Sequence, residues 1–332
     1  MPFADLLGHA NVLALLRQAV ARDRVPQSLL FAGPEGVGKR AAAVALAQAV
    51  NCPVRRAEGG DDGCGRCPTC ERIAAGRHSD VVLLGKGDDA SIKIQPLRDR
   101  VLSVVGYRPF EARYRVFVID PADEMGLEAQ DALLKTLEEP PSAAILILVS
   151  AAPDTLRPTV QSRCRRLRFG PLPEADVARV LERLGVEAGD ASALAAIAGG
   201  SPARALAEDR GDLDADRQAA LDLLAAAGAG PLGGRLKAAA ALAKHGTKRR
   251  DREALAHRLA FLASLLRDLE RLAADREDGL ANADLSVPLA RLQHAFPADR
   301  ADDAFAAVTR ARQALDRNAS PKIVADWLAV TV

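Results

Sequence analysis

The sequence has few aromatic residues, no long apolar run and almost no net charge. Aromatic residues make up 3% of the 332-residue chain, whereas Ala and Leu are abundant, a composition that suits helix packing. No apolar segment reaches the ~20 residues that a membrane-spanning helix requires, and Met1–Asp5 lacks the features of a signal peptide. We therefore expect a cytoplasmic protein with no membrane partner. The net charge of +1 argues against a broadly basic nucleic-acid-binding surface, but it leaves a local basic patch open.

A glycine-rich segment, Gly33-Pro34-Glu35-Gly36-Val37-Gly38-Lys39-Arg40, follows the apolar run Ser28–Ala32 and precedes the Ala-rich segment Ala41–Val50. Strand, glycine-rich loop and helix are the setting of a phosphate-binding loop. Gly33 and Gly38 would allow the tight turn, so that backbone N–H groups and the positive end of the helix dipole face an anion. Lys39 would reach the outer phosphates. The candidate nucleotide-binding residues are Gly33, Gly36, Gly38, Lys39, Arg40 and Asp120.

The nucleotide motif departs from its usual pattern at the positions that handle magnesium and water. Arg40 stands where G-x-x-x-x-G-K-[ST] has a hydroxyl residue, whose side chain normally contacts magnesium. Asp120 ends an apolar strand downstream of the loop, which is the place of a magnesium-coordinating Asp. Pro121 follows it where a catalytic site would have Glu, and we expect Asp123 and Glu124 to be solvated. A glycine-rich turn that binds nothing is the alternative.

Four of the five cysteines are clustered: Cys52, Cys64, Cys67 and Cys70. Thiols stay reduced in the cytoplasm, so such a cluster indicates a metal site more often than disulfides. Four thiolates form a closed tetrahedral set, which predicts a structural zinc ion that stabilises an insert and catalyses nothing. A redox Cys-x-x-Cys site and an iron–sulfur cluster are less well matched by the setting and spacing. A DNA-binding zinc ribbon has little support, because the nearby arginines are only Arg55, Arg56, Arg66 and Arg72.

Strands alternate with helices in the first half of the chain and then disappear. Apolar runs predict strands at 28–32, 80–84, 114–120, 144–149 and 167–169, and helical spacing predicts helices at 6–21, 96–105 and 129–139. Continuous apolar strands separated by helices indicate a parallel sheet covered on both faces. The predicted domains are an α/β domain at 1–170 that contains the zinc module at 52–70, a small helical domain at 171–212 and an all-α domain at 213–332.

The motifs, taken in order, resemble one family, the bacterial clamp-loader subunits of the AAA+ class. The phosphate loop and the four cysteines are followed by Asp131-Ala132-Leu133-Leu134-Lys135-Thr136-Leu137-Glu138-Glu139-Pro140-Pro141 and then by Ser162-Arg163-Cys164. The last two strings are highly specific as a pair. The resemblance covers most of residues 1–210 and the remainder in architecture only. It implies an AAA+ fold, a helical lid for 171–212 and a collar that holds an oligomer together for 213–332.

The same resemblance separates branches of the family. The motor subunits, gamma/tau, keep Ser or Thr after the phosphate-loop lysine, and the delta subunit usually lacks the cysteine site and the Ser-Arg-Cys triplet. This chain is similar to the branch that keeps both features but has an eroded nucleotide site. Ala151, near the position of the residue that senses the γ-phosphate, is a further erosion beside Arg40 and Pro121. ATP binding would then be weak or vestigial, with the chain's own hydrolysis absent or very weak.

The resemblance also implies partners and roles for two arginines. The family forms a heteropentamer with gamma/tau and delta subunits that uses ATP to place a sliding clamp on primer-template DNA. Arg163 would be an arginine finger that reaches ATP on a neighbouring motor subunit, since a guanidinium is always charged and forks onto phosphate oxygens. Arg204 matches a second sensor on the lid. The alternatives are that Arg163 is one of several surface arginines, that the chain is an active ATPase motor, and that it is a zinc-containing DNA-binding module.

Overall fold

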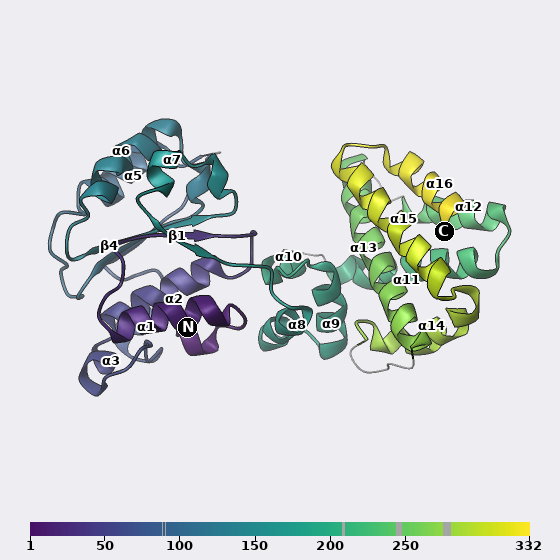
Figure 1. Cartoon of the computed structure of the whole chain (residues 1–332), viewed down its shortest axis with the longest axis horizontal. Helices are drawn as coiled ribbons and strands as arrows, with labels where there is room; N and C mark the ends of the chain where they lie inside the picture. Colours follow the sequence, from purple (N-terminus) through teal and green to yellow (C-terminus); the bar gives the residue numbers. More distant parts are fainter. Residues whose placement is uncertain (88, 90, 208–209, 244–247, 275–279) are drawn as a thin grey trace. The chain divides into compact units, whose positions relative to one another are not determined.

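The computed structural model describes residues 1–87, 89, 91–207, 210–243, 248–274 and 280–332. These residues form two compact units, Met1–Pro173 and Glu174–Val332 (Figure 1). Each unit is described by itself below. The predicted division of the second unit near residue 212 stays a prediction.

The described strands of the first unit form one parallel sheet in the order β2-β3-β4-β1-β5. The strands are β1 (Ser28–Ala32), β2 (Val81–Leu84), β3 (Arg115–Ile119), β4 (Ala144–Ser150) and β5 (Arg165–Arg168). In register, Leu30 lies opposite Leu148 of β4 and Arg166 of β5. The first strand in the sequence is therefore an interior strand, and the phosphate loop leaves its carboxyl end next to the ends of β4 and β5. Ligands of open α/β sheets bind at such ends.

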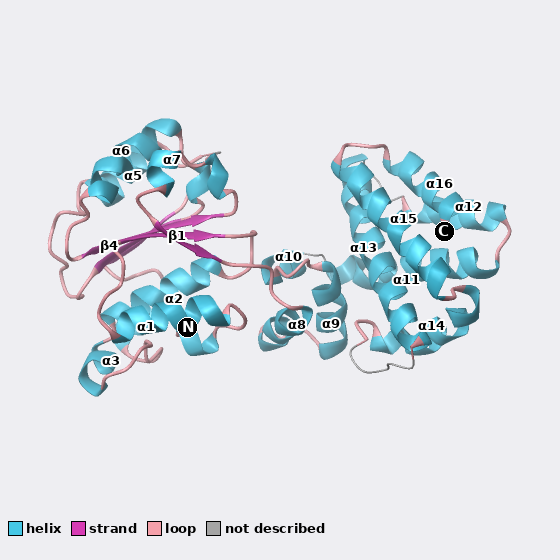
Figure 2. Ribbon diagram, in the orientation of Figure 1, coloured by secondary structure: helices cyan, strands magenta, loops and turns pink. Residues whose placement is uncertain are grey.

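Helices cover both faces of this sheet, as predicted (Figure 2). One face packs against α1 (Ala10–Ala21) and α2 (Lys39–Asn51), and the other against α5 (Ile94–Leu97), α6 (Leu127–Glu138) and α7 (Pro158–Gln161). Successive residues of β1 alternate between the two cores: Leu29 and Phe31 join the first, and Leu30 and Ala32 join the second. Both cores are apolar, which explains why the strands are continuous apolar runs.

Two predicted helices differ from the structure in detail. The helix expected at 6–21 begins at Ala10, because Gly8 and His9 adopt left-handed φ angles of 72° and 52°. Leu6 nevertheless packs against the core from outside the helix, so its spacing was misleading. The helix expected at 96–105 is split into α5 and a π-type segment at Arg98–Leu102.

The cysteine-containing insert follows α2 directly. It contributes two short helices, α3 (Pro53–Glu58) and α4 (Pro68–Ala74), each of which begins with a proline after a cysteine N-cap. Proline suits this position because its missing N–H would have no intrahelical partner. Cys52 and Cys67 therefore lie at helix starts, where their sulfurs accept hydrogen bonds from the backbone N–H groups of Arg55 and Cys70.

Every described element of the second unit is helical. Its helices are α8 (Glu174–Arg183), α9 (Ala188–Ile197), α10 (Pro202–Ala207), α11 (Arg210–Ala229), α12 (Leu232–Leu242), α13 (Lys248–Ala273), α14 (Ser286–Leu292), α15 (Ala298–Asp316) and α16 (Pro321–Thr331). Helix α13 packs against α9, α11, α14 and α15. Among the described residues of the whole chain, no helix combines the length and the apolar character needed to cross a bilayer.

Candidate functional site

The phosphate loop has the glycines that its backbone requires. A Cβ atom on Gly33 would lie 1.9 Å from the carbonyl oxygen of Phe169, so a side chain cannot fit there without moving the backbone. Gly36 and Gly38 have φ angles of 74° and 99°, a region that glycine occupies at little cost. Gly38 is the N-cap of α2, and a Cβ there would have no described atom within 4 Å. The space beside Gly38 at the start of α2 is therefore open.

Lys39 is folded back onto this loop. Its Nζ donates hydrogen bonds to the carbonyl oxygens of Gly33 at 2.6 Å and Pro34 at 2.5 Å, and the residue is only 6% exposed. Burial lowers the pKa of Lys39, although the carboxylates of Asp120, Asp123 and Glu35 act in the opposite direction. His9 lies 2.8 Å from the Val37 carbonyl through Nε2 and contacts the same loop from α1. The lysine thus has a structural role in this conformation besides its expected contact with phosphate.

Arg40 reaches the carboxylate that would otherwise hold magnesium. Asp120 follows β3, and its Oδ2 lies 3.7 Å from Nη1 of Arg40, with the two side chains 22% and 59% exposed. Burial raises the pKa of Asp120, while the charges of Arg40 and Lys39 lower it. The loop backbone and Lys39 therefore fit the phosphates of a nucleotide. The magnesium position does not fit, because a cation replaces the hydroxyl ligand and already pairs with the carboxylate.

Asp123 and Glu124, which were expected to be solvated, are both partly exposed, and both also bond within the chain. Asp123 accepts hydrogen bonds from the backbone N–H groups of Ala151 at 3.0 Å and Ala152 at 3.3 Å, which join the turn after β3 to the end of β4. Glu124 pairs with Nζ of Lys86 at 2.6 Å. The position expected to sense a γ-phosphate, Ala151, is therefore engaged through its backbone N–H with Asp123.

The two family-specific strings contact each other in the structure. Arg163 donates from Nη2 to Oε1 of Glu138 at 2.5 Å and from Nη1 to the carbonyl oxygen of Thr159 at 2.9 Å. Glu138 belongs to the Leu-Leu-Lys-Thr-Leu-Glu-Glu string and Arg163 to the Ser-Arg-Cys triplet. The Arg163 side chain is 34% exposed, so it is held at the surface by one exposed carboxylate. Arg204 lies in α10 of the second unit, where its backbone N–H donates to Oγ of Ser201 at 3.2 Å.

The structure brings the four predicted zinc ligands together. The sulfurs of Cys52, Cys64, Cys67 and Cys70 all lie within 4.8 Å of one another, and those of Cys52 and Cys67 are 4.0 Å apart. Zinc–sulfur bonds of about 2.3 Å in a tetrahedron place sulfurs roughly 3.8 Å apart, so the cluster has the size of such a site. This group of thiols could hold zinc. The fifth cysteine, Cys164, lies outside the group, and burial raises its pKa to about 12.

Backbone groups prepare the cysteine sulfurs to carry negative charge. Sγ of Cys52 accepts from the N–H groups of Arg55 and Cys64, each at 3.4 Å, and Sγ of Cys64 accepts from the N–H of Cys67 at 3.3 Å. Burial alone would raise the pKa of Cys64, but the N–H groups of Arg66 and Cys67 outweigh it and lower the pKa to about 7. Burial raises the pKa of Cys67 and Cys70. A bound cation would offset that burial cost.

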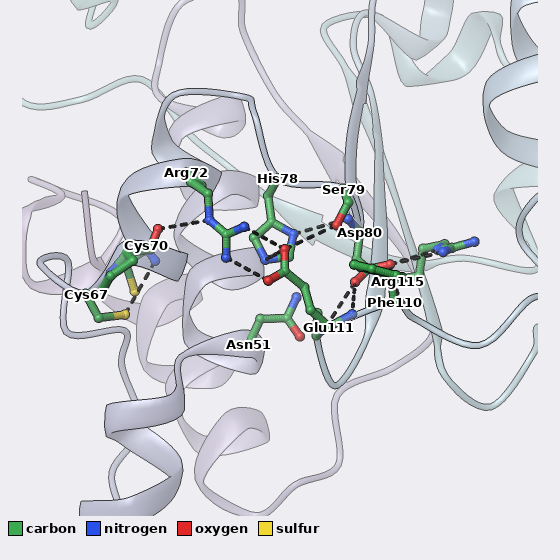
Figure 3. Close-up of polar contacts among 12 residues, drawn as sticks. Asn51, Cys67, Cys70, Arg72, His78, Ser79, Asp80, Phe110, Glu111 and Arg115 are labelled. Carbon is green, nitrogen blue, oxygen red and sulfur yellow. Dashed lines mark hydrogen bonds and ion pairs between the residues drawn. The ribbon is translucent and has the colours of Figure 1, made fainter.

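A polar network that the sequence pattern did not predict ties the cysteine module to the sheet (Figure 3). Arg72 of α4 makes two hydrogen bonds to Glu111, at 2.7 and 2.8 Å, and Glu111 also accepts from Oγ of Ser79 at 3.3 Å. Nε2 of the buried His78 lies 3.6 Å from the same carboxylate, and burial lowers the pKa of His78. Because Arg72 and Arg55 both bond within the chain, they add little support for DNA binding by the module.

Asp80 is the buried centre of this network. Its carboxylate accepts from the backbone N–H groups of Phe110, Glu111 and Ala112 at 2.8 to 3.0 Å, and from Nη2 of Arg115 at 3.0 Å. Burial would raise the pKa of Asp80, but these hydrogen bonds outweigh it and hold the pKa at about 2. The partners lie 30 to 35 residues away in the sequence, so no local pattern reveals them.

Comparison with known proteins gives a family match over the first unit. Residues 8–173 match the family model described as "DNA polymerase III, delta subunit". The chain is 34% identical to DNA polymerase III subunit tau of Bacillus subtilis over 214 residues, 61% of this chain and 36% of that protein. It is 37% identical to subunit delta' of Bacillus subtilis over 177 residues, 52% of this chain and 51% of that protein. The matches thus span about a third to a half of these relatives.

Among solved structures, the chain is similar to a gamma subunit-related protein from Thermotoga maritima. The TM-score is 0.39 with 16% identity, over 96% of this chain and 98% of that one.

Proposed function

The chain belongs to the family described as DNA polymerase III, delta subunit, and from this membership we propose that it is a delta-prime-type subunit of the clamp loader. It would be a stator that helps to load the sliding clamp onto primed DNA. It would supply Arg163 as an arginine finger to ATP on a neighbouring gamma/tau-type subunit, with its own ATP site degenerate. Gamma/tau- and delta-type subunits would be its partners in a heteropentamer, and it would meet the clamp and primer-template DNA through that complex.

The observation that carries the choice of a stator is the position of Arg40. Its guanidinium lies 3.7 Å from Asp120, where a motor subunit needs a hydroxyl group and a free carboxylate for magnesium. Pro121 supplies no group to orient water, and the N–H of Ala151 is bonded to Asp123. Losing metal placement and water activation together removes elements that are each worth roughly 10³-fold in phosphoryl transfer. Turnover by this chain alone should therefore be negligible.

The surroundings of Arg163 support its role in trans. The side chain is 34% exposed, and its charged partner is the exposed carboxylate of Glu138. Exposed ion pairs contribute little to stability, so exchanging Glu138 for the phosphates of a neighbour's ATP is energetically easy. Glu138 would keep the finger oriented until the neighbouring subunit docks.

The test is clamp loading by a complex reconstituted from this chain, its gamma/tau- and delta-type partners, the clamp and primed DNA. Arg163→Ala should leave the complex assembled but lower clamp loading by at least about tenfold. An arginine finger raises the rate of phosphoryl transfer at the ATP that it contacts by roughly 10³-fold or more. Arg166→Ala, an exposed arginine on the neighbouring strand, is the matched control and should load normally. Wild-type loading by an assembled Arg163→Ala complex would overturn the proposed finger.

Other parts of the chain take supporting roles in the proposal. A zinc ion held by Cys52, Cys64, Cys67 and Cys70 would stabilise the insert, in a cytoplasm that keeps the thiols reduced. Within the second unit, α8–α10 would form the lid that carries Arg204, and residues 213–332 would form the collar.

An active ATPase motor is the second candidate, because the chain is also 34% identical to a tau subunit and keeps Lys39. Steady-state phosphate release by the isolated chain separates the two candidates. Robust release that Lys39→Ala abolishes would favour the motor, whereas release at the level of the Lys39→Ala variant supports the stator.

A further inference from the structure

The phosphate loop keeps one half of a nucleotide site and has replaced the other half. The half that holds phosphates is present: the N-terminus of α2 is open at Gly38, and Lys39 lies at its first position. In an ordinary site, the half that holds magnesium consists of two protein ligands, one hydroxyl and one carboxylate. Here the hydroxyl is replaced by Arg40, and the carboxylate of Asp120 lies 3.7 Å from the new guanidinium.

Magnesium has little reason to bind at this position. The ion requires near-ideal octahedral oxygen coordination, and Arg40 supplies no oxygen ligand. Placing a divalent cation at Asp120 would also bring it beside a guanidinium of the same sign, which repels it. Arg40 is 59% exposed, so its side chain is free to move toward phosphate oxygens while the carboxylate stays close.

Arg40 can supply the charge that the metal would supply. A guanidinium forms two parallel hydrogen bonds to phosphate oxygens and is charged at every physiological pH. Lys39 would add a second positive charge on leaving the neutral carbonyls of Gly33 and Pro34, and it would exchange two hydrogen bonds for stronger ones to an anion.

We propose that the phosphate loop of this chain binds a nucleoside di- or triphosphate without magnesium, with Arg40 taking the place of the metal ion. The bound nucleotide is a structural ligand, because Pro121 stands where a catalytic site has the Glu that orients water. The inference deepens the proposed function, and it rests on that function only for the class of ligand.

The experiment is a titration of the full chain with fluorescent ADP and with a slowly hydrolysed ATP analogue, in excess EDTA and in excess Mg²⁺. The dissociation constants of the wild-type chain should agree within about threefold between the two conditions, a difference below the tenfold that 1.4 kcal/mol represents. Lys39→Ala should abolish binding in both. A nucleotide-induced rise in melting temperature should follow the same pattern.

Arg40→Ser restores the hydroxyl of an ordinary phosphate loop and should gain metal dependence, binding at least about tenfold tighter with Mg²⁺ than with EDTA. Arg40→Lys keeps the cation and should remain independent of the metal. Arg77→Ser changes an exposed arginine away from the loop and should behave like the wild type. Since Arg40 is largely exposed, its variants should fold, and circular dichroism checks this.

Two results would overturn the proposal: wild-type binding that requires Mg²⁺, or no binding at millimolar nucleotide in either condition. Neither result bears on clamp loading by the reconstituted complex, which tests Arg163. The two proposals therefore fail separately.

Discussion

Helix α2 has a ligand motif at each end, and the two motifs differ in how complete their ligand sets are. At its N-terminus the phosphate loop keeps its backbone geometry but has lost the hydroxyl for magnesium, and at its C-terminus Cys52 begins a complete set of four thiols. A closed metal site needs every ligand, because a missing sulfur opens the coordination sphere. The glycines of a phosphate loop can be required for packing alone, since Gly33 must be glycine to pack against Phe169 whether or not a nucleotide binds. An intact glycine pattern is therefore weaker evidence for chemistry than an intact cysteine set.

The strongest way to break this comparison is to remove one ligand from the cysteine end. Cys67→Ser should reduce bound zinc from one ion per chain to nearly none and lower the free energy of unfolding by more than about 3 kcal/mol, because metal binding is coupled to folding of the insert. Zinc analysis and urea unfolding measure both effects. Cys164→Ser removes a thiol outside the cluster and should keep its zinc. Undiminished zinc in Cys67→Ser would remove the assignment.

At the other end of α2, Gly33→Ala should cost about 3 kcal/mol, since its Cβ would meet the Phe169 carbonyl oxygen at 1.9 Å and the backbone must shift. Gly38→Ala is the matched change. It meets no described atom within 4 Å but keeps a φ angle of 99°, so it should cost about 1 kcal/mol. Urea unfolding of both variants measures the difference. Equal losses would show that packing against Phe169 is not the reason for Gly33.

The junction between the cysteine module and the sheet gives a smaller effect that depends on pH. The pKa of Asp80 is about 2 in the folded chain and near 4 when unfolded, so its stabilisation is complete above pH 4 and is lost as the pH falls toward 2. Asp80→Asn should therefore lower stability by about 2 kcal/mol at pH 7.

The difference in unfolding free energy between Asp80→Asn and the wild type should shrink below pH 4. Measuring this difference cancels zinc loss on acidification, which both proteins share. A difference that stays constant from pH 7 to pH 2 would contradict the assigned pKa.

The smallest expected effect comes from the outer layer of the same network. Arg72→Ala removes the pair with Glu111, whose side chains are 42% and 34% exposed. Exposed pairs contribute little and are screened by salt, so the melting temperature should fall less than in Asp80→Asn and converge with the wild type as salt is added. Zinc content should not change. A loss larger than that of Asp80→Asn would show that the exposed pair of Arg72 and Glu111 contributes more to the junction than the buried carboxylate of Asp80.

The sequence predicted those features that depend on residues close together in the chain. The sheet with helices on both faces follows from apolar runs, and the cysteine cluster follows from spacings of three residues. What it missed depends on distant partners. Asp80 was read as the first residue of a strand, although Phe110–Ala112 and Arg115 determine its environment. Likewise Leu6 has helical spacing but reaches the core from before Gly8 and His9, whose left-handed backbone conformation keeps the helix from beginning before Ala10.

The interior position of β1 has a consequence for how the chain is made. Its hydrogen-bonding neighbours end at Ser150 and Arg168, so Ala32 leaves the ribosome 136 residues before the last residue that flanks it. At synthesis rates of 5–20 residues per second, β1 and the phosphate loop wait on the order of ten seconds without their sheet. The four thiols of the cysteine module all lie within residues 52–70, so the whole ligand set is made early in that interval. Newly made chains would therefore expose the apolar β1 to chaperones after all four thiols of the insert have been made.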